Sequence, residues 1–164
     1  MKDETLNSLR FHMRTLHELV GDLNDAQMVQ QPAGVANHPA WTLGHIAYSF
    51  EGIGEEIGLE PWLPTEWVDR FGTGSTPTDD PGAYPTKQEL LEVLADGERR
   101  VRERLASLDD AALGAPLPDE QHRDLFATMG CAVLHVLVGH TGAHLGQLVV
   151  WRRAMGLPPA TLII

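Results

Sequence analysis

Two histidines near the C-terminus, His140 and His144, have the spacing of a chelating pair. Residues four apart in an α-helix lie on one face with Cβ atoms about 6 Å apart, so both imidazoles could bind one metal ion. Zinc-type sites use three or four protein donors, so a further ligand must come from another element. His45 is the candidate, because it lies in an apolar helical stripe where a titratable side chain needs a partner.

Three imidazoles with no thiolate or carboxylate beside them would leave coordination positions open, as catalytic metal sites do. The same spacing also fits a simpler interpretation, in which a buried histidine pair is hydrogen-bonded to backbone or hydroxyl groups. Spacing alone does not decide between the two. Helical periodicity places Ser49, Tyr48 and Gln147 near the three candidate ligands, and His12 of the first helix could also line the site. Each of these four side chains could orient a ligand or substrate.

The remaining histidines are predicted to lie outside this site. His135 pairs with Cys131 at a spacing of four, but at about 100° per residue it lies about 140° around the helix from His140. Cys131 is interpreted as an ordinary buried small residue. His38 and His122 fall at helix starts or in loops, where solvated side chains are expected.

Composition excludes several classes of partner and compartment. The chain has 164 residues with 23 acidic against 12 basic side chains, and its net charge of −11 repels nucleic acid. A single cysteine cannot form an internal disulfide, and the N-terminus lacks the apolar core of a signal peptide, so a cytoplasmic protein is expected. Phosphate loops, zincin motifs, di-iron motifs and nucleophile elbows are not found in the sequence.

Apolar periodicity predicts four helices that must position the histidines. They cover about residues 3–23, about 39–58 with Pro39 in the first turn, about 86–108 behind a Thr86–Glu89 capping box, and a last apolar segment. Between the second and third helices, the stretch from Pro61 to Pro85 holds five prolines and three glycines and reads as a long crossover.

The last segment has no Asp, Glu, Lys or Arg over the 27 residues from Leu125 to Trp151. Its length would allow a membrane span, but its histidines, glutamine and glycines favour a helix buried in a soluble bundle, and a homodimer is expected through it. The sequence therefore predicts a single all-α domain over residues 1–164, a four-helix bundle with a long crossover between helices 2 and 3.

Two motifs make the chain resemble the DinB/YfiT-like superfamily of metal-binding four-helix bundles. One is the run from Trp41 to Ala47 (WTLGHIA). The other is His140-x-x-x-His144 followed by Leu-Gly-Gln and then by RRAMGL from Arg152. The likeness extends over roughly residues 5–157. Many members place a further histidine four residues before the first ligand of the last helix, whereas His135 here is five before His140.

The resemblance implies that His45, His140 and His144 hold a divalent ion, often nickel or zinc. Related proteins include transferases and isomerases that use a low-molecular-weight thiol. Our leading hypothesis is a thiol-dependent S-transferase acting on a small electrophile, and the alternatives are a metal-dependent hydrolase and a non-catalytic, metal-stabilised stress-response module. Because only neutral imidazole binds metal, affinity is expected to weaken below about pH 6.

Overall fold

The computed structural model describes residues 2–32 and 34–160, and within them it contains no β-strand. Three long helices are continuous, and a fourth is built from three consecutive segments. Their bounds are α1 (Lys2–Val20), α3 (Pro39–Glu56), α5 (Lys87–Ser107) and a last helix of α7 (Met129–Leu134), η3 (His135–His140) and α8 (Thr141–Ala154). The predicted all-α bundle of four helices is thus confirmed.

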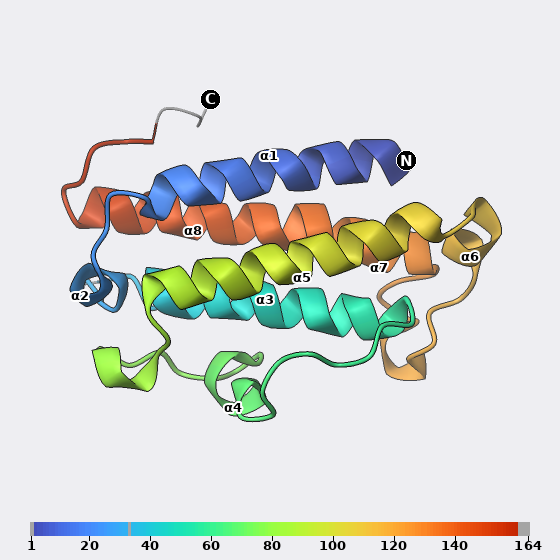
Figure 1. Ribbon diagram of the computed structural model, residues 1–164, viewed down its shortest axis with the longest axis horizontal. Helices are drawn as coiled ribbons and strands as arrows, with labels where there is room; N and C mark the ends of the chain where they lie inside the picture. Colours follow the sequence, from blue (N-terminus) through green and yellow to red (C-terminus); the bar gives the residue numbers. More distant parts are fainter. Residues whose placement is uncertain (1, 33, 161–164) are drawn as a thin grey trace.

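The four helices pack as two pairs, α1 beside α8 and α3 beside α5 (Figure 1). Figure 1 shows that α3 and α5 run in the same direction, although they follow each other in the chain. Parallel neighbours cannot be joined by a tight turn, because the chain must first return along the length of the bundle. This requirement explains the long crossover that the sequence predicts between these two helices.

Short helical pieces interrupt the connections. The crossover contains α4 (Trp67–Phe71) and the 3₁₀ turn η1 (Pro81–Ala83), while α2 (Asp25–Met28) follows α1, and α6 (Asp110–Gly114) and η2 (Glu120–His122) precede the last helix. In α4, Trp67 and Phe71 are buried and anchor the crossover on α3. The crossover is therefore packed on the bundle rather than extended into solvent.

Helix starts follow the capping signals in the sequence. Thr86 and Glu89 form the predicted capping box of α5, and Pro39 occupies the first turn of α3. His38 is the N-cap of α3, with its Nδ1 accepting from the Trp41 amide and its Nε2 2.9 Å from the Thr78 carbonyl. The prediction of a solvated His38 was wrong: the crossover covers this ring, which is fully buried.

The last helix is the apolar element of the bundle, and it packs against both α1 and α3. By length and composition, Met129–Ala154 could cross a membrane, but its packing in the bundle is consistent with a soluble domain. The helix begins at Met129 behind the cap Thr128 rather than at Leu125. Cys131 is exposed in its first turn, so the prediction that it is buried was wrong.

A π-helical segment, η3, shifts the register of the last helix just before α8. In a π-helix the i→i+5 hydrogen bonds stack residues five apart on one face. The His135 ring therefore lies 6.5 Å from that of His140, centroid to centroid. The 140° estimate assumed a uniform α-helix, which the π-segment is not, but the exposed His135 lies outside the group of three histidines as predicted.

Candidate metal centre

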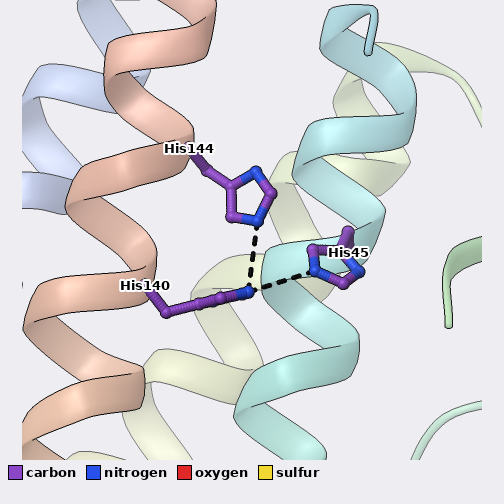
Figure 2. Close-up of side chains that lie close together, drawn as sticks. All are labelled: His45, His140 and His144. Carbon is purple, nitrogen blue, oxygen red and sulfur yellow. Dashed lines mark hydrogen bonds between the residues drawn. The ribbon is translucent and has the colours of Figure 1, made fainter. Parts of the chain in front are cut away.

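Three imidazoles from two helices meet between α3 and the last helix (Figure 2). His140 Nε2 lies 3.1 Å from His45 Nε2 and 3.1 Å from His144 Nε2. The candidate ligand atoms of all three residues lie within 4.8 Å of one another. The structure thus brings together the three residues that the sequence singled out, across 95 positions of chain between His45 and His140.

Hydrogen bonds on the outer side of two rings fix which nitrogen faces the centre. His45 Nδ1 lies 2.6 Å from the Phe71 carbonyl oxygen, and His144 Nδ1 lies 3.0 Å from Gln147 Oε1. Both oxygens can only accept, so each Nδ1 carries the proton and each Nε2 presents a lone pair. This pattern, in which an outer acceptor fixes the tautomer of a histidine, is typical of metal ligands.

Gln147 is itself held in place, since its Oε1 also accepts from Asn37 Nδ2 at 3.1 Å. Asn37 lies in the loop before α3, so this contact links that loop to α8 above the histidine cluster. The predicted neighbour Gln147 therefore contacts a histidine of the cluster directly. Asn37 was not singled out from the sequence, because nothing in its local context marks it as a partner of residue 147.

The environment keeps the three rings neutral. Burial lowers the pKa of His45, whereas the hydrogen bond to Phe71 opposes this shift. Burial and then the neighbouring imidazoles lower the pKa of His140 to about 4, and burial and then His45 lower that of His144 to about 4. All three are deprotonated at neutral pH, which is the state that binds metal.

The donor set fits a divalent transition metal. Neutral imidazoles suit nickel, zinc, copper and iron. His45 Nε2 and His144 Nε2 each carry a lone pair, and both atoms lie 3.1 Å from His140 Nε2. At most one hydrogen, on His140 Nε2, could lie among these three atoms, so hydrogen bonds within the cluster cannot satisfy both lone pairs fully. His140 Nδ1 is buried and has no hydrogen-bond partner in the described part of the chain.

A cavity of about 480 Å³ lies one turn along the helices from the cluster, between α3, the start of the last helix and the loop that carries η2. None of the three histidines lines it. Ser49, four residues after His45, and Val136, four before His140, both line it. Tyr48 lines the same cavity, and the Ser49 hydroxyl donates to the His45 carbonyl at 2.8 Å. The cavity lies within the size range of small-molecule sites.

The fourth predicted neighbour, His12, lies on another side of the last helix. Its ring is within contact distance of the position where a Cβ on Gly142 would lie, and its buried Nδ1 has no hydrogen-bond partner among residues 2–32 and 34–160. Burial lowers the pKa of His12, and a hydrogen bond with the Leu137 backbone opposes this. His12 therefore contacts the backbone of η3 and α8 rather than the three imidazoles.

Comparison with known proteins gives one family and one fold. The sequence model of the DinB superfamily matches residues 8–148. The crystal structure of a conserved protein from Enterococcus faecalis is similar with a TM-score of 0.75 at 17% sequence identity, over 95% of this chain and 98% of the other. That likeness shows the fold alone. No curated protein matches the sequence significantly.

Proposed function

Because the chain belongs to the DinB superfamily and gathers three neutral histidines at one point, we propose that it is a metal-dependent enzyme. In this proposal His45, His140 and His144 hold a nickel or zinc ion, and the reaction is the transfer of a thiol to a small electrophile. The observation that carries the proposal is the convergence of the Nε2 atoms with the protons of two rings held on the outer side.

When bound, the ion would supply Lewis acidity, which lowers the pKa of a coordinated thiol or water and makes it a nucleophile at neutral pH. The chain's own residues provide the rest. Phe71 and Gln147 hold the ligand rings in one tautomer, and Trp41 stacks on His45 with ring centroids 4.6 Å apart. The adjoining cavity gives a substrate a place to lie one turn from the ligands.

The charge of this cavity supports a preference among substrates. Glu55, Glu56 and Asp119 line it, and His122, which also lines it, is hydrogen-bonded to Asp119 at 2.6 Å. Burial, together with the neighbouring carboxylates, raises the pKa of Glu55. Like charges near one another disfavour a further anion. We therefore expect a cationic or neutral thiol to be accepted better than an anionic one.

Metal analysis tests the site. Untagged wild-type protein should contain nearly one equivalent of nickel or zinc, and His45→Ala, His140→Ala and His144→Ala should each lose it. His17→Ala changes an exposed histidine of α1 and should retain the wild-type content. Wild-type protein that neither contains metal nor takes it up would refute the proposal.

Turnover then tests the reaction. The metal-loaded protein is assayed with a small alkylating electrophile and three thiols that differ in charge: cysteamine, 2-mercaptoethanol and 3-mercaptopropionate. The proposal predicts metal-dependent and thiol-dependent consumption of the electrophile, with the lowest kcat/KM for 3-mercaptopropionate. Turnover that needs metal but no thiol would identify a hydrolase instead, and metal binding without any turnover would favour the non-catalytic module.

A further inference from the structure

A backbone carbonyl of the crossover contacts one of the three clustered histidines directly. Helix α4 ends at Phe71, whose carbonyl oxygen lies 2.6 Å from His45 Nδ1. Within the described residues, the outer nitrogen of His45 has this carbonyl as its hydrogen-bond acceptor, and the carbonyl belongs to a residue 26 positions further along the chain. The orientation of one candidate ligand therefore depends on where α4 is docked.

Gly44 makes this docking possible. It precedes His45 in α3, and a Cβ at this position would overlap the aromatic ring of Phe71. The fully buried Phe71 ring thus lies directly on the backbone of α3, and its carbonyl comes within reach of the next residue's imidazole. A larger residue at position 44 would force α4 away from the helix.

The crossover also contacts the tryptophan that stacks on the face of the same imidazole. Trp41 stacks on His45 with an interplanar angle of 10°, and the Trp41 indole donates to Ser75 Oγ at 2.9 Å. Ser75 lies in the crossover, four residues after Phe71. One segment therefore determines both the tautomer of the ring and the position of the indole that covers it.

We propose that the crossover is a positioning element for His45, with Gly44 as its docking site on α3, so that metal affinity and the docking of α4 are coupled. The inference rests on the proposed metal site. Coupling is reciprocal, so a docked α4 that strengthens metal binding must itself be stabilised by the metal to the same extent.

The first test compares two glycine-to-alanine variants of the same helix. Gly44→Ala should raise the dissociation constant for Ni²⁺ about 10- to 100-fold, as loss of an outer partner of a metal ligand does. Gly52→Ala is the matched control, because a Cβ there meets nothing within 4 Å. Affinity is measured by competition with a chelator. Equal affinities in two correctly folded variants would overturn the proposal.

A compensating substitution separates positioning from general damage. Phe71→Leu removes ring atoms that a Cβ at position 44 would overlap, while the backbone carbonyl remains. The double variant Gly44→Ala/Phe71→Leu should therefore recover at least part of the lost Ni²⁺ affinity. If the losses of Ni²⁺ affinity in the two single variants simply add in the double variant, the proposed packing of α4 on Gly44 is contradicted.

Two spectroscopic measurements on the wild type do not depend on how the variants fold. In metal-free protein, ¹⁵N NMR should show the His45 proton on Nδ1, and its appearance on Nε2 would overturn the inference even if metal binds. Ni²⁺ should slow hydrogen exchange of the Gly72 amide, which bonds the Val68 carbonyl of α4, but not that of Leu113 in α6. Equal protection at both amides would contradict the coupling.

The two proposals can fail separately. Wild-type protein that binds no Ni²⁺ would refute the proposed function, whereas the His45 tautomer would still report whether the crossover holds the ring. Conversely, stoichiometric Ni²⁺ binding that is insensitive to Gly44→Ala would leave the metal site in place and remove the role of the crossover.

Discussion

At the scale of single residues, His140 and His144 hold protons weakly, since burial and neighbouring imidazoles lower both pKa values to about 4. In an unfolded chain the same rings titrate near 6.5. Between about pH 6.5 and 4 the unfolded state therefore binds more protons than the folded state. Stability contributed by the neutral rings is fully present above that window and is lost as pH falls through it.

We expect the free energy of unfolding of the metal-free protein to decrease from pH 7 to 4.5. Urea denaturation at pH 7, 5.5 and 4.5 measures this slope. His144→Gln removes one of the shifted groups and should flatten it, while the exposed-site variant His17→Ala should keep the wild-type slope. A wild-type stability that rises on acidification would contradict the assignment.

The same low pKa values change the expected pH range of metal binding. A ring of pKa near 6.5 would lose about tenfold affinity by pH 5.5 through proton competition, whereas one near 4 loses almost none. Since burial lowers the pKa of all three ligands, we expect calorimetric titrations to show a smaller loss of Ni²⁺ affinity between pH 7 and 5.5 than three free imidazoles would give. This result would place the acid limit below the value near pH 6 that free histidine suggests.

Gln147 offers a test of the outer hydrogen bond of His144. Gln147→Leu removes the acceptor of the Nδ1 proton and should weaken Ni²⁺ binding about tenfold or more. Gln147→Glu keeps an acceptor oxygen and should retain the affinity. Chelator competition measures both variants, and equal affinities for Leu and Glu would show that the hydrogen bond does not position the ligand.

At the scale of elements, one ion pair between a buried arginine and an exposed aspartate ties the end of α8 to the segment that follows α1. Arg152 is 4% exposed and donates to both carboxylate oxygens of Asp22, to the Leu19 carbonyl and to the Pro158 carbonyl. Removing one partner of such a network leaves buried groups unpaired. The pair therefore fixes how the helix carrying His140 and His144 packs on α1.

Arg152→Ala should lower the free energy of unfolding by about 1–3 kcal/mol, because the buried Leu19 carbonyl loses its donor. The neighbouring exposed Arg153 serves as the control, and Arg153→Ala should change stability by less than about 0.5 kcal/mol. Chemical denaturation monitored by tryptophan fluorescence compares the two. Similar losses in both variants would argue against the network as the cause.

Local periodicity predicts the regular helices of the bundle but not the π-helical segment. Apolar stripes predict α1, α3 and α5 well, helped by Pro39 at the start of α3 and by the capping box of α5, because such signals depend on residues within a few positions. The π-segment η3 has no such signature, and it moves His135 towards His140. Whether an apolar helix accommodates one extra residue in a turn depends on what packs against it.

At the scale of the whole molecule, metal binding and folding should be linked. A ligand present at 1,000 times its dissociation constant stabilises the native state by about 4 kcal/mol. For a domain of this size that corresponds to a rise in Tm of roughly 10 °C. Calorimetry with Ni²⁺ and after chelation should show this shift in the wild type and its loss in His45→Ala; an unchanged Tm at saturation would count against specific binding to the folded state.

Two predictions concern the binding partners of the whole molecule: it does not bind nucleic acid, and it forms a homodimer. The net charge of −11 disfavours nucleic acid. A homodimer through the last helix remains expected, and Leu134 and Val150 on that helix are 41% and 53% exposed. Sedimentation equilibrium of the metal-loaded protein measures the oligomeric state, and a monomer at micromolar concentration would contradict the expectation.

Local patterns in the sequence are enough to predict the four helices, the crossover between the second and third, and the pairing of His140 with His144, because each depends on neighbours in the chain. His45 was expected as the third ligand from its place in an apolar stripe and from the family resemblance, but the meeting of its ring with this pair and the Phe71 carbonyl that orients it are visible only in the folded chain. A main-chain carbonyl is common to all residues and carries no sequence signal. Contacts across 95 positions depend on how helices pack, which periodicity within one helix does not encode.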